Sequence, residues 1–546
     1  MMTFCKTRVL VTLLLTSLLA ACGGGGGGDG AAPVPPPAVT VPVTPPVTAP
    51  VEPPAPTVPV QVPQAQYTIP TGLWSAPSGA TPASGNYVYL QSSAGDYIGG
   101  GRTYSYTNAD TVLSMSSRGL SIEASVRGNQ SWTGTFLLPS AALTLQSGYF
   151  KELTRTAFSD AAVGGVDWSG EGRGCNKIQG WVVIDRVVMS GGMLDALDLR
   201  FQQACDGGAP LYGQIHWNKA DVDSGKVTEP APIPTGLWRA PASAVPPSGN
   251  YMHLESTQGD YIGAGRTYSY TQSNAAIKLT PSGNTLTVAI GGDESWSGDF
   301  QGLYSMSRLA VGYYGVLGRY PFSNPVLGGL SWSGDGRGCN SLSGWFVVDK
   351  ISYSGNTLTA LDLRFEQHCE GGAGALRGQL HWTADDTSAP MGPQNPPPAN
   401  LWAPDASFVA PPGNYVYLVS TPGDYIGGGV TELLSAANTS MNVTTNLTAA
   451  LRVGIGSWSG DFVGMSSMSQ LQPGYYGDLQ RYPFHNPNKG GLSWGGKGRG
   501  CNTLKGWFIV DKVSYSQAAL TAIDLRFEQR CEGGTAALRG VIHWIK

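Results

Sequence analysis

The chain has 546 residues, and its 33 Lys and Arg nearly balance 37 Asp and Glu, giving a net charge of −4 at pH 7. Nucleic-acid backbones are bound by clustered positive charge, so this balance argues against a nucleic-acid partner. The 76 glycines and the aromatic content of 10% favour many short strands and turns over long helices. We therefore expect an all-β protein.

The first residues have the pattern of a secretory signal. Lys6 and Arg8 form a short basic start, and an apolar run follows from Val9 to Leu19. A run of about 11 residues is too short to span a bilayer permanently and is typical of a signal peptide. No other segment is long and apolar enough to cross a membrane. Residues 1–21 are therefore expected to be removed on export.

The residues that end this signal, Leu19-Ala20-Ala21-Cys22, resemble the lipobox of bacterial lipoproteins. The resemblance covers only the N-terminus. It implies cleavage before Cys22, acylation of the Cys22 thiol with fatty acids such as palmitate, and anchoring through the buried acyl chains. Gly23 in place of Asp implies the outer membrane, with the periplasmic face and the cell surface both left open. An ordinary signal peptide with a chance cysteine is the alternative.

The next segment, residues 22–69, is expected to be a flexible tether. Six glycines, Gly23 to Gly28, cannot pack, and Pro33 to Pro63 is dominated by Pro, Val, Thr and Ala. Such a composition favours an extended polyproline II stalk or a disordered spacer, reaching roughly 90 to 100 Å when fully extended.

The rest of the chain repeats one pattern three times. A Gly-Arg-Gly-Cys-Asn turn, two strand-like segments, a Cys-(Asp/Glu)-Gly-Gly turn and a final His-Trp recur at Gly172 to Trp217, Gly336 to Trp382 and Gly498 to Trp544. A Leu-Trp dipeptide precedes each copy. We predict three tandem antiparallel β-sandwich domains, with a jelly roll as one strand order: repeat 1 (70–217), repeat 2 (234–382) and repeat 3 (400–546), joined by linkers 218–233 and 383–399.

Six cysteines remain once Cys5 and Cys22 are set aside, two in each repeat at the same separation. An exported chain with this spacing favours one disulfide per repeat over a zinc site, which needs four ligands. The expected pairs are Cys175 with Cys205, Cys339 with Cys369 and Cys501 with Cys531.

In repeat 2 these cysteines flank a predicted hairpin. One strand runs from Trp345 to Tyr353, the turn includes Ser354, and Leu358 to Gln367 runs back. Hydrophobic residues alternate with Asp362, Arg364 and Glu366, so one face is expected in the core and the other in water. The final strand is expected to pair with this one and to bring carboxylates near guanidinium groups.

Titratable residues give weak signals for chemistry. Asp362 and Glu366 have the residue types of a glycosidase acid and base, but repeat 1 has Gln202 at the second position, and cross-strand ion pairs explain the pattern more simply. The histidines before the final Trp have no nucleophile or metal-ligand spacing: His216, His381 and His543. The Gly-Asp-Tyr-Ile-Gly turns are expected to be capped by their aspartates, with calcium as the alternative: Asp96, Asp260 and Asp424. We expect no catalytic residue, metal or cofactor.

Aromatic and arginine side chains form the better candidate site. They recur in repeats 2 and 3 within Gly-Tyr-Tyr, Arg-Tyr-Pro-Phe-x-Asn-Pro and Trp segments that we expect to be loops. Flat rings with cationic donors suit stacking on sugars or on a partner protein, whereas rings that fill the sandwich would be the simpler alternative. Repeat 1 differs from this motif and has Arg155-Thr156-Ala157-Phe158 at the same position. The candidate binding residues are Tyr314, Arg319, Tyr320, Trp332, Tyr476, Arg481, Tyr482 and Trp494.

Three hypotheses about function follow. The first is a lipid-anchored envelope or surface protein whose three sandwiches bind carbohydrate or another surface protein. The second is a ligand-free spacer or stalk. The third, and least supported, is a secreted glycoside or polysaccharide hydrolase.

Overall fold

The computed structural model describes residues 67–221, 226–386, 388, 392–445 and 449–546. All described residues belong to one compact unit. The expected signal peptide, Cys22 and the stalk up to residue 66 lie outside the described residues. Within the described residues, no helix is long and apolar enough to cross a membrane.

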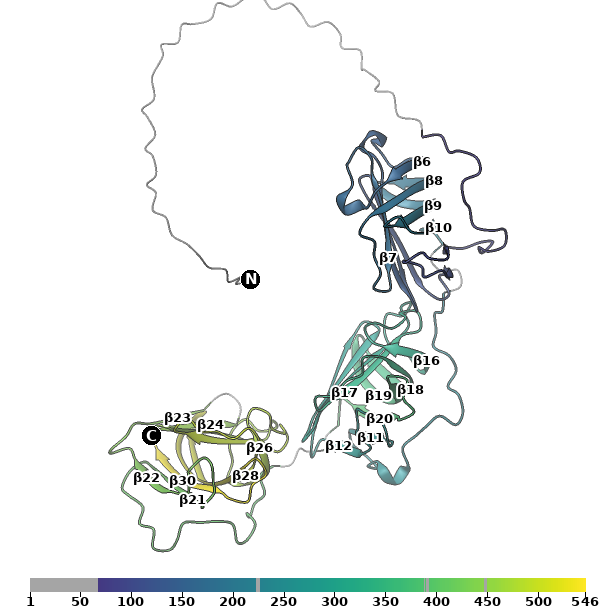
Figure 1. The fold of residues 1–546 in the computed structure, drawn as a ribbon. Coiled ribbons are helices and arrows are strands. Elements are labelled where there is room, and N and C mark those ends of the chain that lie inside the picture. The colour runs from purple at the N-terminus through teal and green to yellow at the C-terminus, as the bar shows by residue number, and fades with distance from the viewer. Residues whose placement is uncertain (1–66, 222–225, 387, 389–391, 446–448) are drawn as a thin grey trace, which may run out of the picture. The chain divides into compact units, whose positions relative to one another are not determined.

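The fold is all-β, as predicted (Figure 1). In the described parts of the chain each repeat has ten strands, and short 3-10 turns lie at Ser140–Ala142, Thr156–Phe158 and Ala242–Ala244. The strands of repeat 1 are β1 (Tyr87–Ser92), β2 (Thr103–Thr107), β3 (Val112–Arg118), β4 (Ser121–Arg127), β5 (Ser131–Leu137), β6 (Gly148–Leu153), β7 (Gly165–Gly170), β8 (Ile178–Ser190), β9 (Met193–Cys205) and β10 (Pro210–Asn218). Those of repeat 2 are β11 (Tyr251–Ser256), β12 (Thr267–Thr271), β13 (Ala276–Ser282), β14 (Thr285–Gly291), β15 (Ser295–Gln301), β16 (Gly312–Arg319), β17 (Gly329–Gly334), β18 (Leu342–Ser354), β19 (Thr357–Cys369) and β20 (Leu376–Thr383). Those of repeat 3 are β21 (Tyr415–Ser420), β22 (Thr431–Ser435), β23 (Met441–Thr445), β24 (Ala450–Ile455), β25 (Trp458–Val463), β26 (Gly474–Arg481), β27 (Gly491–Gly496), β28 (Leu504–Ser516), β29 (Ala519–Cys531) and β30 (Leu538–Ile545).

The strand order is the same in every repeat. In repeat 2 it is β12-β11-β20-β19-β18-β16-β17-β15-β14-β13, and repeat 3 follows it strand for strand. Repeat 1 has this order divided into a six-stranded and a four-stranded sheet. Most neighbours in the sheet are also neighbours in sequence, so the sandwich is a folded, near-barrel meander and not a jelly roll.

The hairpin between the cysteines is confirmed. Strands β18 and β19 pair from Ser354 and Thr357 at the turn to Leu342 and Cys369 at the open end. Disulfides Cys175–Cys205, Cys339–Cys369 and Cys501–Cys531 close this end in the three repeats, as predicted. Strand β19 also pairs with β20, which places Glu366 opposite Arg377, and their side chains form an ion pair of 2.6 Å.

The expectation of a wet outer face on β19 is wrong at its centre. Arg364 is only 3% exposed, because the Leu-Trp segment before β11 lies over this face of the sheet. The Arg364 guanidinium donates to the Trp238 carbonyl at 2.6 Å and to both Asp349 oxygens at 2.7 and 3.0 Å. Repeats 1 and 3 have the same contact, from Arg200 to Trp74 and from Arg526 to Trp402. The Leu-Trp dipeptide is therefore part of each folded repeat.

The core of each repeat contains one glutamine. Gln367 lies on the inner face of β19 and is 0% exposed. Its amide nitrogen donates to the Trp332 carbonyl at 2.8 Å, and its amide oxygen accepts from the Trp332 backbone N–H at 2.9 Å. Gln203 and Gln529 make the same two contacts with Trp168 and Trp494. This paired hydrogen bond joins β17 to β19 across the sandwich and satisfies two buried backbone groups.

The segments before each repeat also join its edge. Ala231 and Gln394, from the expected linkers, form bridges to Tyr313 and Tyr475. Tyr67 packs on the Phe150 ring at 4.5 Å, so repeat 1 begins before residue 70.

Candidate functional site

Four of the eight candidate binding residues are core residues. Tyr314 and Trp332 are each 1% exposed, and Tyr476 and Trp494 are 0% and 1% exposed. They lie in strands β16, β17, β26 and β27, so the expectation that they form exposed loops is wrong. The Tyr314 ring stacks on Phe346 at 4.3 Å, and burial raises the pKa of Tyr314 to about 12. These four rings stabilise the sandwich.

A β-bulge explains why β16 was not predicted. Tyr314 and Leu317 both face the core although they are three residues apart, because the register of β16 against β18 shifts between them. Val316, inside the bulge, has φ of 56°. An extra residue breaks the period of two by which a strand is identified in a sequence.

The other four candidates stay near the surface. Arg319 and Tyr320 are partly exposed, as are Arg481 and Tyr482. The Arg319 guanidinium donates to the Asn340 carbonyl at 3.4 Å, next to the disulfide, and Arg481 contacts Asn502 at the same distance.

An exposed phenylalanine that we did not select lies beside these arginines. Phe322 is 79% exposed, and the Arg319 guanidinium carbon lies 5.4 Å from its ring centre. Repeats 1 and 3 have the same pair at the same position, Arg155 with Phe158 at 5.2 Å and Arg481 with Phe484 at 5.4 Å. Phe158 and Phe484 are 76% and 74% exposed. We call these the arginine–phenylalanine pairs. The sequence signal was Arg-x-x-Phe, which all three repeats share.

A second exposed ring recurs in the Gly-Asp-Tyr-Ile-Gly turns. Tyr97, Tyr261 and Tyr425 are 58%, 60% and 60% exposed. In repeat 2, Arg337 donates to the neighbouring Ile262 carbonyl at 2.7 Å, and Arg173 makes the same contact with Ile98 in repeat 1. In repeat 2 the tyrosine turn and the arginine–phenylalanine pair therefore both contact the short Arg337–Asn340 segment, through Ile262 and Arg319.

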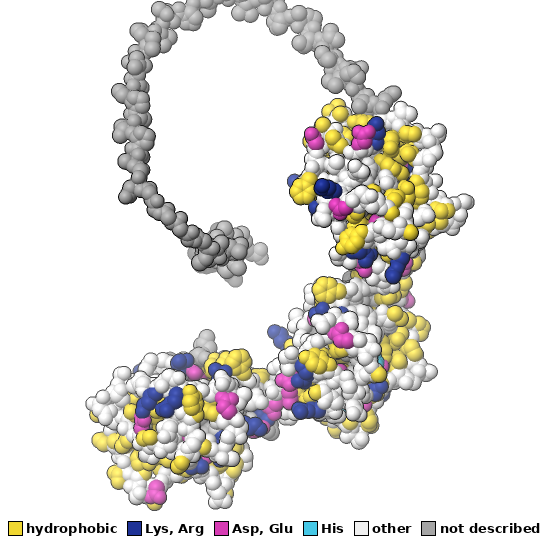
Figure 2. Space-filling model, in the orientation of Figure 1, with side chains coloured by type: hydrophobic (Ala, Val, Ile, Leu, Met, Phe, Trp, Pro, Cys, Tyr) yellow, Lys and Arg dark blue, Asp and Glu magenta, His cyan; other side chains and the backbone are white. Residues whose placement is uncertain are grey.

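Figure 2 shows a mixed surface, with hydrophobic side chains next to Lys and Arg on the face it presents and Asp and Glu scattered among them. A surface of this kind offers apolar faces and hydrogen-bond donors together, which suits a polar ligand with flat apolar faces.

The aspartates of the turns act as caps. Asp260 is buried, and its carboxylate accepts hydrogen bonds from the Ser256 hydroxyl at 2.6 Å and from the Gly263 and Ile262 backbone at 2.7 and 3.1 Å. Asp96 and Asp424 repeat this arrangement. Among the described residues, no group of three or more His, Cys, Asp and Glu side chains is placed to hold a metal ion.

An aspartate–histidine pair recurs on the outer face of each sheet. The Asp362 carboxylate lies 2.5 Å from His381 Nδ1, and the imidazole stacks on Tyr251 with ring centres 5.7 Å apart. The other pairs are Asp198 with His216 and Asp524 with His543. In the parts of the chain that the structure describes, no hydroxyl or thiol is hydrogen-bonded to Nε2 of these histidines. Each aspartate therefore orients the imidazole of its histidine, and no described hydroxyl or thiol is in contact with Nε2.

Glu366, the second carboxylate of the hydrolase hypothesis, contacts Arg377 and His368. Burial raises its pKa, but hydrogen bonds from Arg377 at 2.6 Å and His368 at 3.3 Å outweigh burial, so the pKa of Glu366 lies below its ordinary value. A general acid needs the opposite shift, since it must hold a proton near neutral pH. The direction of this shift does not favour Glu366 as the general acid of a hydrolase.

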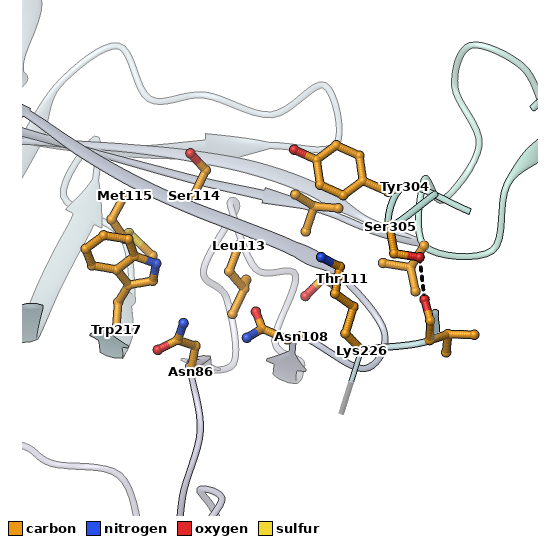
Figure 3. A pocket seen from close by; sticks show the side chains of 13 residues that line it. Asn86, Asn108, Thr111, Leu113, Ser114, Met115, Trp217, Lys226, Tyr304 and Ser305 are labelled. Atoms are coloured by element: carbon orange, nitrogen blue, oxygen red, sulfur yellow. Dashed lines mark hydrogen bonds between the residues drawn. The ribbon is translucent and has the colours of Figure 1, made fainter. Parts of the chain in front are cut away.

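One cavity of about 270 Å³ lies where repeat 1 meets repeat 2 (Figure 3). Leu113, Met115 and Trp217 of repeat 1 line it, and Tyr304 and Ser305 of repeat 2 face them. The Ser305 hydroxyl donates to the Val227 carbonyl at 2.6 Å. The cavity thus belongs to the contact between the two repeats.

No protein-family model, curated protein or solved structure matches this chain.

Proposed function

We propose that this protein is a lipid-anchored protein of the cell envelope, in the outer membrane, whose three β-sandwich repeats are binding or adhesion modules for carbohydrate. The observation that carries the proposal is the arginine–phenylalanine pair, present at one position in each repeat with the ring at least 74% exposed. Single exposed aromatics are ordinary on protein surfaces. The same exposed ring is present in all three repeats, although repeat 1 has Thr-Ala where repeats 2 and 3 have Tyr-Pro between Arg and Phe, and this favours a shared ligand.

The chemistry of the pair favours sugars. The apolar face of a pyranose stacks on an aromatic ring, while a guanidinium and the exposed tyrosine hydroxyl provide hydrogen bonds to its hydroxyl groups. Three such surfaces on one chain allow weak contacts to add, because binding at one repeat raises the effective concentration of ligand at the others. A protein ligand is the alternative partner with the same requirements.

The lipid anchor rests on the N-terminal sequence. Acylation at Cys22, with residues 23–66 as a tether, would hold the repeats at the membrane while leaving them free to reach a ligand. Metabolic labelling with a palmitate analogue tests this part, and Cys22→Ser is expected to abolish the label.

A glycan array and polysaccharide pull-down with the mature chain test the binding proposal. We expect binding to at least one polysaccharide and its loss in a variant with Phe158→Ala, Phe322→Ala and Phe484→Ala. Leu143→Ala is the matched control, because Leu143 is also an exposed hydrophobic residue, at 63%, but lies outside the shared pattern. A wild-type chain that binds no glycan would favour the second hypothesis, a ligand-free spacer, which the burial of Tyr314, Trp332, Tyr476 and Trp494 also supports.

A further inference from the structure

One asparagine in repeats 2 and 3 reaches into the preceding repeat. Asn486, in the loop after β26, is 1% exposed. Its amide nitrogen donates to the Asn274 carbonyl at 2.8 Å and to the Asp293 carboxylate at 2.9 Å, both in repeat 2. Asn324, the corresponding residue of repeat 2, donates to the Asp110 carbonyl at 3.0 Å and to the Asn129 side chain at 3.1 Å, both in repeat 1.

The same side chain also shapes its own loop. The Asn486 amide oxygen accepts from the Asn488 backbone N–H at 2.9 Å, and the Asn324 oxygen accepts from Val326 at 3.0 Å. Both ends of the amide are therefore used, one within the repeat and one between repeats.

Repeat 1 makes only the hydrogen bond within its own loop. Asp160 occupies the corresponding position and accepts from the Ala162 backbone N–H at 2.9 Å, which forms the same loop. A carboxylate has no N–H to donate, and Asp160 is exposed. Repeat 1 is the first of the three repeats in this sequence, and it lacks the amide donor that repeats 2 and 3 direct toward the repeat before them.

Repeat 3 lacks the acceptor side chain of this contact. The acceptor side chains Asn129 and Asp293 lie in the turns that join β4 to β5 and β14 to β15. In repeat 3 the equivalent turn is shorter, because Ile455 pairs directly with Trp458. No residue is left at the position of the acceptor side chain, and repeat 3 is the third of the three repeats in this sequence.

We infer that the asparagine loop is a directional junction that docks each repeat onto the turns of the repeat before it. Repeat 1 lacks the amide donor and repeat 3 lacks the acceptor side chain, so the complete contact forms between successive repeats. The inference does not depend on the ligand of the protein, because it rests on the position of donors and acceptors along the chain.

The two junctions differ in chemistry. At the first, Val326 and Tyr304 meet repeat 1 beside the cavity of Figure 3. At the second, Asn488 replaces Val326 and donates to the Gln272 carbonyl at 2.6 Å. Lys489 adds an ion pair with Asp293 at 2.8 Å. The second junction is thus the more polar one.

Hydrogen exchange of the full chain tests the junction by comparing three equivalent loops. Gly164, Gly328 and Gly490 donate to the carbonyls of the junction-position residues of their own loops, at 2.9, 3.0 and 3.0 Å. This backbone hydrogen bond within the loop is therefore the same in all three repeats. We expect exchange to be at least about tenfold slower in peptides covering 322–328 and 484–490 than in 158–164, because docking must open first.

Asn486→Asp makes the test specific. Asp160 shows that the loop forms with aspartate, so the variant keeps its loop while it loses the N–H donor and faces Asp293 with a like charge. Exchange in 484–490 should rise to the rate of 158–164, while 322–328 stays slow. Asp160→Asn is the matched control and should change nothing. Equal exchange in the three wild-type loops, or an Asn486→Asp chain with unchanged exchange in 484–490, would overturn the inference.

Discussion

The buried glutamine of each repeat gives the sharpest stability prediction. Gln367→Leu keeps the approximate volume of the side chain but removes both hydrogen bonds to the Trp332 backbone. Each buried backbone group that loses its partner costs about 1 to 3 kcal/mol, and the greater hydrophobicity of leucine returns about 1 kcal/mol. The net loss is about 3 kcal/mol, which corresponds to a fall in Tm of roughly 6 to 12 °C for a domain of this size.

Differential scanning calorimetry of the full chain measures this shift. Gln203→Leu and Gln529→Leu remove the same contacts in repeats 1 and 3, so the three variants together assign the transitions to the repeats. Gln258→Leu, on an exposed turn of repeat 2, is the control and should change Tm little. A Gln367→Leu chain that melts within about 2 °C of wild type would refute the view that these hydrogen bonds hold β17 to β19.

Two further changes probe the stability of repeat 2. Loss of the disulfide through Cys339→Ala with Cys369→Ala should destabilise the repeat by about 3 to 4 kcal/mol on the chain-entropy model, and denaturant unfolding of the oxidised chain measures it; a loss below about 1 kcal/mol would contradict that model here. Burial lowers the pKa of His253 from its ordinary value of 6.5, so the unfolded state binds the proton more readily. Stability is therefore complete above the unfolded pKa and is lost as the pH falls below it, and the Tm of repeat 2 should drop between pH 7.5 and pH 5.5. His253→Tyr, which introduces the residue found at the equivalent positions Tyr89 and Tyr417, should remove that drop, and an unchanged pH profile would count against the assignment.

The sequence predicted the parts of the fold that follow a regular period. Strand β19 alternates hydrophobic and polar residues, and the cysteines lie at equal distances from the turn between β18 and β19, so the hairpin and its disulfide could be identified. Strand β16 could not be identified, because its bulge places Tyr314 and Leu317 on one side. The buried Arg364 was also missed, since nothing in β19 itself indicates that the Leu-Trp segment covers it.

Only part of the candidate site could be predicted from the sequence, for a similar reason. Repeats 2 and 3 resemble each other most closely, and their shared tyrosines and tryptophans drew attention to rings that prove to be core. The exposed ring belongs to Arg-x-x-Phe, which all three repeats share. Asn324 and Asn486 were part of the same motif, but their role depends on the preceding repeat, which the sequence of one repeat cannot show.

The central claim, that each repeat contributes one arginine–phenylalanine pair to binding, is tested most directly by removing the rings one at a time. The measurement is the equilibrium Kd of the full chain for a polysaccharide, for wild type and for variants that lack Phe484, then Phe322 and Phe484, then all three rings. The account predicts that Kd rises at every step, by about tenfold or more for each ring as avidity is lost, while Leu143→Ala leaves it unchanged. A triple variant that binds as tightly as wild type would contradict the claim.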